Sequence, residues 1–520
     1  MRTPLPQRLT PLAASLGLMP LYGDIHSHCA LSYGHGRLED ALARAALQLD
    51  FVSITGHADW PDMPVDDPAV AHIVDFHVKG FARLRQNWIG HFETLKAFDR
   101  DGTLSVFPGY EIHSNAHGDY TIVYADLRPS RLELADSPQA LRHALARSKG
   151  DRALAFPHHI GYRRGARGIN WDTFDERLSP FVEMVSMHGC AETSETERTY
   201  LHSMGPVDGH STMEWGLGRG HLFGIIGNTD HHSGFPGSWG HGRTGVLAAG
   251  HGREAIWDAL RARRTNALTG DNTHLLAAID TTVQGGVIEP RKHADLRIEA
   301  VAGGFIDTID VIRNGHLFAR ISPELTPAPI DAGETGTVET ILHVELGWGA
   351  RGTSHLWDGQ IQLAHGEVLA VEPRFRGAEI VSPLEGSDPD HAVPQLDFDG
   401  AGVSFVVRSE ANPNNATAAT QGLAIRFRAT RDAVIDARLC GTPVSVPLAR
   451  LFEGAVSGNL GPIDSPAYRF HALPHPRQWQ WQGAVGLGAF EAGEHVRVRL
   501  RQTNGQVAWA SPLFCRRSDG

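Results

Sequence analysis

Histidine and carboxylate residues in the first half of this sequence are spaced in a way that suits metal binding. The densest group is Gly23-Asp-Ile-His-Ser-His28. Alternate side chains of a strand share one face, so Asp24, His26 and His28 would project together at intervals of about 6.5 Å. Two imidazoles placed in this way can bind one metal ion. A His-x-His pair standing alone is equally compatible with a polar strand end that binds no metal.

Residues of the same types follow other apolar runs. His57 ends the run that begins at Phe51, and Glu111 ends the run that begins at Val106. Three later apolar runs are followed by residues of the same types: one by His158 and His159, the next by His188, and the last by Asp230, His231 and His232. The carboxyl ends of the strands gather at one face of an α/β barrel, so these side chains would meet there. Six separate runs that end in this way are poorly explained by chance.

The elements that carry these residues alternate between strands and helices. Leu21–His26 and Phe51–Thr55 read as strands, Leu38–Leu49 reads as a helix, and a long helical stretch runs from about Val70 to Phe98. This alternation predicts a mostly parallel α/β sheet, either closed into a barrel or doubly wound.

The pattern changes after about Asn272. Apolar and polar residues then alternate, which is the period of half-buried antiparallel strands. The clearest examples are Leu296–Val301, Thr340–Leu346, Leu423–Arg428 and Val496–Leu500. We therefore predict a metal-binding α/β domain over residues 1–272 and a β-sandwich-like domain over residues 273–520. The stretch Ser382–Asp399 is rich in Pro, Asp and Gly and is predicted to be an exposed loop.

Composition limits the partners and the compartment. The 520 residues carry a formal net charge of -12 and show no block of Lys and Arg, so we expect no nucleic-acid partner. No apolar run approaches the roughly 20 residues of a membrane span, and no membrane association is expected. The four cysteines form no Cys-x-x-Cys pair, which suits a reducing compartment and predicts a cytoplasmic protein. A homo-oligomer is compatible with this composition.

The order of these motifs resembles the PHP superfamily, named for its polymerase and histidinol-phosphatase members. The matching segments are Asp24-Ile-His-Ser-His28, Ser53-Ile-Thr-Gly-His57, Gly109-Tyr-Glu111, Pro157-His-His159, Met187-His188 and Asn228-Thr-Asp-His-His232. They span about residues 21–250, and the larger PHP-like proteins with a C-terminal β domain are the most similar. The resemblance implies a distorted (β/α)7 barrel, a TIM-like fold, with two or three divalent metal ions, Zn, Mn or Fe. It also implies phosphoester hydrolysis as the commonest activity.

The sequence departs from the family pattern at two places. Many members carry Asp within a Ser-Asp-Gly sequence after the His-x-His pair, whereas this chain has Ser32-Tyr33-Gly34 followed by His35. Many members also carry Asp before the strand-terminal His, where this chain has Gly56. The first departure removes a ligand that a third metal ion would use, although His35 could substitute for it.

The expected metal ligands are therefore His26, His28, His57, Glu111, His158, His188, Asp230 and His232. Asp24, His35 and His159 are further candidates, and the choice between His158 and His159 stays open. The resemblance makes Glu111 the bridging carboxylate, and a metal-bound hydroxide is the expected nucleophile.

Three residues near these ligands are candidates for catalytic roles. His113 and His117 could donate a proton to the leaving group or support the ligands, and an exposed loop histidine is an equal alternative. Arg164 belongs to a loop with Arg163 and Arg167 that could bind a small phosphorylated or carboxylated substrate, because guanidinium groups bind such anions bidentately. A solvated basic loop is the alternative.

Two other functions fit the same residues. The first is a metal-dependent hydrolase of an amide, ester or carbon-carbon bond, because phosphate and carboxylate substrates require similar positive pockets. The second is a non-catalytic metal-binding or carbohydrate-binding protein that works through Trp348, Trp357, Trp479 and Trp481 of the β domain. These tryptophans more often fill the core of a sandwich.

Overall fold

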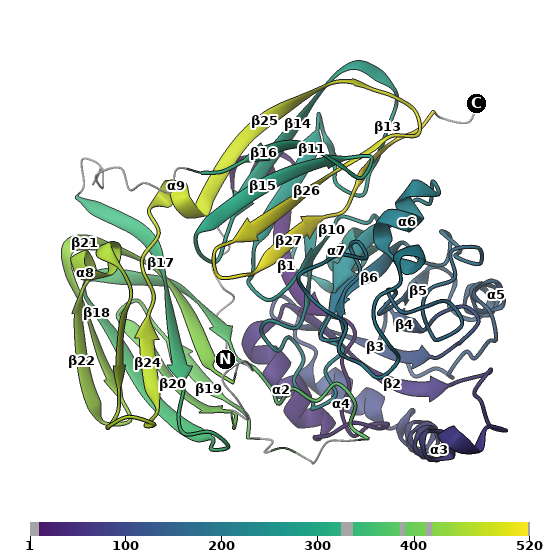
Figure 1. Ribbon diagram of the computed structural model, residues 1–520, viewed down its shortest axis with the longest axis horizontal. Coiled ribbons are helices and arrows are strands. Elements are labelled where there is room, and N and C mark those ends of the chain that lie inside the picture. Colours follow the sequence, from purple (N-terminus) through teal and green to yellow (C-terminus); the bar gives the residue numbers. More distant parts are fainter. Residues whose placement is uncertain (1–9, 324–335, 385–388, 390–391, 412–418, 518–520) are drawn as a thin grey trace.

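The computed structural model describes residues 10–323, 336–384, 389, 392–411 and 419–517. It consists of one α/β part and two β-rich parts (Figure 1). The α/β part holds the strands β1 (Met19–Asp24), β2 (Phe51–Asp59), β3 (Ser105–Ile112), β4 (Tyr120–Tyr124), β5 (Ala153–Pro157), β6 (Phe181–Ser186), β7 (Gly189–Cys190), β8 (Gly224–Gly227), β9 (Arg243–Ala248) and β10 (Thr265–Leu268).

The helices of this part are mostly short and amphipathic. In α2, Leu38, Ala41, Leu42 and Ala45 recur at helical spacing and are buried together. The single helical stretch predicted from about residue 70 to 98 is divided into two helices that meet near Gly90, a residue with low helix propensity. The helices are α1 (Pro11–Ser15), α2 (Leu38–Gln48), α3 (Ala71–Asn87), α4 (His91–Phe98), α5 (Pro138–Ser148), α6 (Met213–Gly218) and α7 (Arg253–Arg261), with 3-10 turns at Pro68–Val70, Gly150–Arg152 and Gly209–Ser211.

The strands of the α/β part are arranged in a curved, mixed sheet. β1, β2 and β3 are parallel neighbours, while β4, β5, β9 and β10 join the same sheet through antiparallel pairings. β6 and β8 form a separate parallel pair. β5 contacts β6, and β8 contacts both β9 and β10, so the two sheets follow one another around a common interior.

The structure confirms a mixed α/β fold but does not confirm the predicted distorted (β/α)7 barrel. Strand β3 is followed directly by the antiparallel β4, with no helix between them. β9 and β10 are likewise antiparallel to each other. A (β/α)7 barrel places a crossover helix between successive parallel strands. The connection between β3 and β4 is too short to hold such a helix, so the chain reverses direction and the two strands pair antiparallel.

The first β-rich part packs two layers together. One layer is the sheet β12-β11-β14-β25, and the other contains β13, β28, β26, β15 and β16. Their shared core includes Leu296, Ile298, Ile309, Val498 and Leu500. The strands are β11 (His274–Ile279), β12 (Thr282–Val283), β13 (Val287–Ile288), β14 (Arg291–Val301), β15 (Ile306–Arg313), β16 (His316–Ile321), β25 (Gln480–Phe490), β26 (His495–Gln502), β27 (Val507–Ala510) and β28 (Leu513–Cys515).

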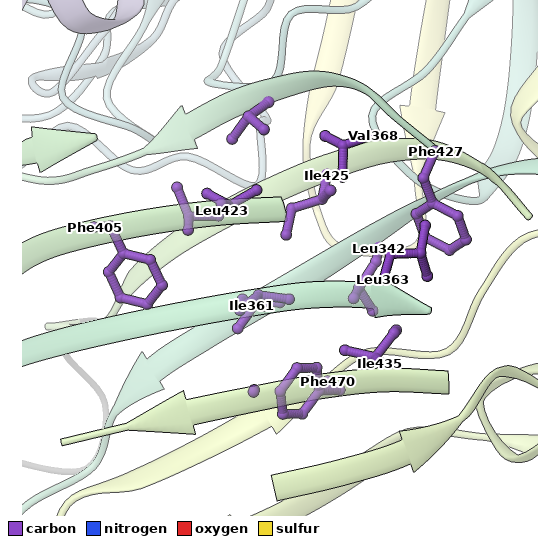
Figure 2. Packing of buried hydrophobic residues seen from close by; sticks show 14 of the residues in the cluster. Leu342, Ile361, Leu363, Val368, Phe405, Leu423, Ile425, Phe427, Ile435 and Phe470 are labelled. Carbon is purple, nitrogen blue, oxygen red and sulfur yellow. The ribbon is translucent and has the colours of Figure 1, made fainter. Parts of the chain in front are cut away.

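The second β-rich part is an eight-stranded antiparallel sheet built around two long strands, β18 and β21. Its apolar side chains alternate along these strands and meet in one core, where Ile361, Leu423 and Phe470 are among the buried residues (Figure 2). The elements are β17 (Thr337–Gly347), β18 (His355–Arg374), β19 (Gln395–Phe398), β20 (Gly402–Ser409), β21 (Gln421–Leu439), β22 (Thr442–Pro447), α8 (Leu448–Glu453), β23 (Val456–Asn459), β24 (Ala467–Phe470) and α9 (Pro476–Trp479).

The end of the chain returns to the α/β part. β27 pairs antiparallel with β10, so one continuous sheet runs from the first β-rich part into the α/β part. The predicted boundary after residue 272 lies between β10 and β11, and the independence of the two halves stays a prediction. No helix in the described ranges is long and apolar enough to span a bilayer.

The predicted exposed loop Ser382–Asp399 lies only partly within the described residues. Residues 385–388 and 390–391 lie outside them. Gln395–Phe398 form the short strand β19, and the segment from 381 to 384 lies against the α/β part.

Candidate metal centre

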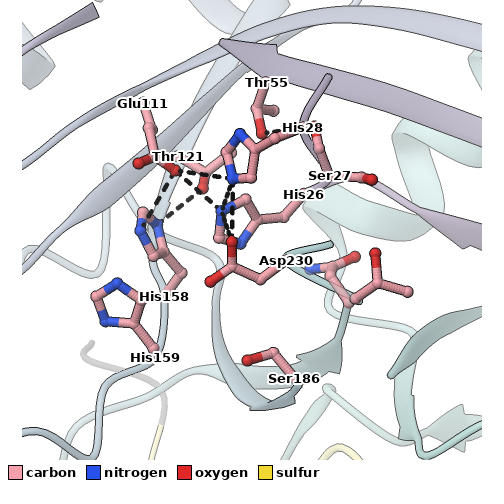
Figure 3. Close-up of polar contacts among 12 residues, drawn as sticks. His26, Ser27, His28, Thr55, Glu111, Thr121, His158, His159, Ser186 and Asp230 are labelled. Carbon is pink, nitrogen blue, oxygen red and sulfur yellow. Dashed lines mark hydrogen bonds and ion pairs between the residues drawn. The ribbon is translucent and has the colours of Figure 1, made fainter. Parts of the chain in front are cut away.

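Strand ends bring the predicted residues together. His26 and His28 follow β1, His57 lies near the end of β2, and Glu111 lies near the end of β3. Because these strands are parallel neighbours, their carboxyl ends share one edge, and His57 is directly opposite Glu111 in the register. Residues that follow β5, β6 and β8 approach from the other side, so that imidazoles and carboxylates face one another (Figure 3).

The Glu111 carboxylate lies at the centre of one half of this cluster. Its Oε2 atom is 3.0 Å from His26 Nε2 and 3.5 Å from His158 Nε2. Its Oε1 atom is 3.1 Å from His57 Nε2 and 3.3 Å from His113 Nε2. The two oxygens therefore face different imidazoles, which is the arrangement that a bridging carboxylate requires.

Asp230 is the carboxylate of the other half. Its Oδ1 atom is 3.0 Å from His28 Nε2, and its Oδ2 atom is 2.8 Å from His188 Nε2. The residue has a φ of 51°, in the left-handed region that is uncommon for residues other than Gly. A backbone held in this conformation at a cluster of chemically active groups is a feature of functional sites.

The second ring nitrogen of most of these histidines is held from outside the cluster. The Nδ1 atoms are paired with Glu183 for His26 (2.8 Å), Ser32 for His57 (2.9 Å), Asp119 for His113 (2.9 Å), Thr121 for His158 (2.8 Å) and Tyr162 for His188 (2.9 Å). These contacts fix the rings with Nε2 pointing inward. Metal-binding histidines are usually oriented by such outer partners.

The charges of the cluster suit a bound cation. Burial would raise the pKa of Glu111, but His28, His26 and His113 together lower it below its ordinary value. Burial and the neighbouring imidazoles lower the pKa values of His57, His158 and His232, so these rings are neutral. Ionised carboxylates and neutral imidazoles are the forms that bind metal ions.

His26 differs from the other rings. Burial lowers its pKa, but Asp230 and Glu183 outweigh burial and raise the pKa well above its ordinary value. The carboxylates therefore attract a positive charge to this position, which either a protonated His26 or a metal ion provides.

Several sets of three side chains in this cluster could hold a metal ion. They include His28, His57 and His232; His26, His28 and Glu111; His57, Glu111 and His113; Asp119, His158 and His159; and His159, His188 and Asp230. The donor atoms of each set lie within 4.8 Å of one another, and all of these side chains are buried. Imidazole nitrogens and carboxylate oxygens without thiolates suit Zn, Mn or Fe.

The structure brings the eight expected ligands together, and it places the further candidate ligand His159 and the candidate catalytic residue His113 in the same cluster. His158 faces Glu111, whereas His159 Nε2 lies 3.2 Å from Asp119 Oδ2. Asp24 lies behind the cluster, where it accepts hydrogen bonds from Thr229 and from the Gly237 amide. His35 lies at the edge of the cluster, where its backbone amide donates to the carbonyl of His232.

Two of the three candidate catalytic residues lie elsewhere. Arg164 is exposed and forms an ion pair with Asp172 at 2.6 Å. His117 is paired with Thr173 at 3.0 Å. Arg167, from the same loop as Arg164, is the arginine that reaches the cluster, because the turn at residues 163–168 directs its side chain inward. Its guanidinium group donates to Asp119 and lies over the Trp60 ring.

Asp119 and Glu183 were not identified from the sequence, although Glu183 carried a signal. It is a charged residue within the apolar run Phe181–Ser186, and it is buried with its Oε2 atom accepting from His26 and Asn228. A buried charge of this kind requires a partner. Asp119 directly precedes the apolar strand β4, and nothing local distinguished it from a turn residue.

A cavity of about 310 Å³ opens above the cluster. Its polar floor contains Glu111, Asp230 and His188, and Arg167 lines one side. The remaining walls are largely apolar and include Trp60, Ile73, Phe76, Met204 and Val381. Val381–Leu384 come from the second β-rich part, so the cavity is completed by the C-terminal half of the chain.

Glu183→Gln tests the role of the outer contacts. The substitution keeps the size of the side chain but removes the charge that holds His26 Nδ1 at 2.8 Å. We expect affinity for Zn²⁺ or Mn²⁺ to fall by about 10–100-fold, as is typical when such a partner of a metal-binding histidine is lost. Competition with a chromogenic chelator measures this affinity. Glu133→Gln is the control, because Glu133 is also buried but is paired with Arg131. Unchanged affinity in Glu183→Gln would contradict the assignment.

Comparisons with known proteins give only distant similarities. No family model matches this chain. It is 24% identical over 174 residues to an uncharacterised protein of Chlamydia muridarum (strain MoPn / Nigg), a match that covers 30% of this chain and 28% of that protein. The chain thus spans less than a third of the length of this relative.

Two solved structures are also similar over part of the chain. One is a two-domain protein from Bacteroides vulgatus that contains a predicted PHP-like metal-dependent phosphoesterase. Its TM-score is 0.34 at 16% identity, and the match covers 62% of this chain and 84% of that chain. The other is PsfC from Pseudomonas syringae, with a TM-score of 0.31, 15% identity, and coverage of 46% and 89%. Similarities at these TM-scores are too low to indicate what this chain does, so its function is inferred from its own site.

Proposed function

We propose that this chain is a metal-dependent hydrolase of the PHP type that cleaves a phosphate ester of a small molecule. The observation that carries the proposal is the convergence of buried imidazole Nε2 atoms on Glu111 and Asp230, with the opposite ring nitrogens held by outer partners. A polar core that binds no metal does not explain why so many neutral imidazoles face ionised carboxylates at the floor of a cavity.

The residues present suit divalent metal ions, and we propose that two or three of them bind. His26, His57 and His158 would bind beside Glu111, and His28 and His188 would bind beside Asp230. Bound metal ions would act as Lewis acids toward the substrate and lower the pKa of water. The number and identity of these ions belong to the proposal.

The cysteine next to the cluster is not an activated nucleophile. Cys29 follows His28, but burial raises the pKa of its thiol to about 12, so the thiolate that attacks a substrate is not formed near neutral pH. We assign the role of nucleophile in the proposed reaction to water. Arg167 faces the cavity with a guanidinium group that can bind an anionic substrate, and the apolar walls exclude bulk water from the reacting group.

Metal analysis combined with a substrate panel tests this proposal. Protein purified without chelators should contain two or more equivalents of Zn, Mn or Fe, and dialysis against a chelator should abolish hydrolysis until metal is restored. The panel should contain phosphomonoesters, phosphodiesters, carboxylic esters and amides, and we expect turnover of a phosphate ester alone. Metal-free protein that hydrolyses the same ester would overturn the proposal. Turnover of only an amide or a carboxylic ester would retain the metal site but reassign the reaction.

A further inference from the structure

A second cavity lies where the three parts of the molecule meet. Its volume is about 490 Å³, within the range of cavities that bind small organic molecules. Trp239 of the α/β part forms one wall. The first β-rich part contributes Gly303–Phe305, Thr503, Asn504 and Gln506. The rest comes from β17, β18 and β24 of the second β-rich part and from the residues that follow β18 and β24. None of its lining residues lines the cavity above the metal cluster.

Basic side chains dominate the lining of this interface cavity. Arg374, Arg376, Arg469, His343 and His471 face it, whereas Glu345 is the one acidic residue among its described lining. Glu345 already has partners, because its carboxylate accepts hydrogen bonds from His471 at 2.9 Å and from Thr420 at 2.7 Å. Within the described ranges neither Arg376 nor Arg469 has a carboxylate within 4.0 Å, while Arg374 is paired with Asp271 at 3.1 Å.

The basic groups are held in place before any ligand binds. The Arg374 and Arg376 guanidinium carbons lie 5.4 and 4.4 Å from the centroid of the Trp239 ring. Trp239 is itself fixed by its indole N–H, which donates to Asp271 at 2.7 Å. Stacking on an aromatic ring orients a guanidinium group while leaving its N–H donors free for an anion.

Several polar atoms of the residues that line the interface cavity have no hydrogen-bond partner in the described part of the protein. His343 is 9% exposed and Arg374 is 1% exposed, yet His343 Nε2 and Arg374 Nε have no hydrogen-bond partner there. Arg376 Nε is likewise buried without a partner. Burial, followed by the electrostatic effects of Arg374, His471, Arg376 and Arg469, lowers the pKa of His343 well below its ordinary value, so the ring is neutral. Buried donors beside repelling cations are costly unless an anion compensates them.

We propose that the interface cavity binds a small organic anion through a phosphate or carboxylate group, at a site distinct from the metal centre. Arg376 and Arg469 supply the charge, and His343 supplies a further polar contact. Both kinds of anion match the planar guanidinium fork, so their shared chemistry is what the site recognises. This inference does not depend on the reaction catalysed at the metal centre.

Calorimetric titration of the full-length protein tests the site, with inorganic phosphate and succinate as separate probes. The protein is first stripped of metal, so that phosphate does not bind at the metal centre. We expect saturable binding of at least one probe, weakened at higher salt and accompanied by a higher unfolding temperature, because a ligand that binds only the folded state stabilises it. Phosphate binding alone would identify a phosphorylated ligand, and succinate binding alone a carboxylated one.

Substitutions then locate the binding. Arg469→Ala removes an exposed side chain from β24, and His343→Gln keeps a polar group of similar size. Each should weaken binding at least about tenfold, the loss expected for a charge-assisted hydrogen bond. Arg438→Ala, an exposed arginine of β21 outside the cavity, and Glu111→Gln, at the metal centre, should leave binding of the probes unchanged. Absence of binding by both probes, or equal binding by wild type, Arg469→Ala and His343→Gln, would overturn the proposal.

Discussion

Glu111→Gln is expected to abolish turnover and to reduce metal content together. The Glu111 oxygens lie 3.0 Å from His26 Nε2 and 3.1 Å from His57 Nε2, so the carboxylate stands between imidazoles of two strands. The substitution replaces a charged group that has two equivalent oxygens with a neutral amide of almost the same size. We expect turnover to fall by more than the roughly 10²–10⁴-fold loss that is typical of removing a general acid or base.

Metal content measured by mass spectrometry separates this prediction from a loss of substrate binding. His117→Ala is the matched control, because His117 follows Glu111 closely in sequence but its side chain contacts Thr173. That variant should retain both metal and turnover. A fully metallated and active Glu111→Gln enzyme would show that Glu111 does not bridge metal ions. His113→Ala is informative as well, since the ring lies 3.3 Å from Glu111 and loss of metal would identify it as a ligand.

Arg167→Met should destabilise the fold strongly. Arg167 Nε donates to Asp119 at 2.7 Å, and the Asp119 side chain is fully buried. Although burial alone would raise the pKa of Asp119, Arg167 and His113 hold it well below its ordinary value, so the carboxylate stays ionised. Removing one partner of a buried ion pair leaves an uncompensated charge and costs about 3–5 kcal/mol. Urea denaturation of metal-free protein measures this loss.

A double variant distinguishes the ion pair from simple packing. Asp119→Asn removes the buried charge, so Arg167→Met combined with Asp119→Asn should lose less stability than the two single losses added together. Arg164→Met is the matched control, because Arg164 lies in the same loop but its exposed ion pair with Asp172 contributes little. An equal loss in Arg164→Met and Arg167→Met would contradict the proposed role of the buried pair.

Much of the candidate site followed from local sequence. An apolar run predicts a buried strand whatever its neighbours are, and the residue that ends the run is then placed at the edge of a sheet. Six of the expected ligands are located by this pattern, namely His26, His57, Glu111, His158, His188 and Asp230. The tertiary structure brings them within contact distance of one another. The change from helical to alternating periodicity after residue 272 likewise predicted the β-rich second half.

The sequence did not predict which loop side chains point toward those ligands. Arg164 and Arg167 are equivalent in composition and lie three residues apart, yet only Arg167 turns inward. Its φ of 66° places it in a turn, and its side chain is held by Asp119, which lies 48 residues earlier in the chain. The inward position of His113 has the same origin, because its backbone amide is held by the carbonyl of Asp59.

The sequence by itself determined which residue types could bind metal and which strands would present them, because strand and ligand are neighbours in the chain. Only the tertiary structure decided which residues surround those ligands. Asp119, which precedes β4, and Glu183, in β6, reach the cluster because long-range packing sets the pairing of these strands. Val381–Leu384 reach the cavity from the other half of the chain. Such contacts join residues far apart in sequence, and local periodicity carries no information about which distant segments will meet.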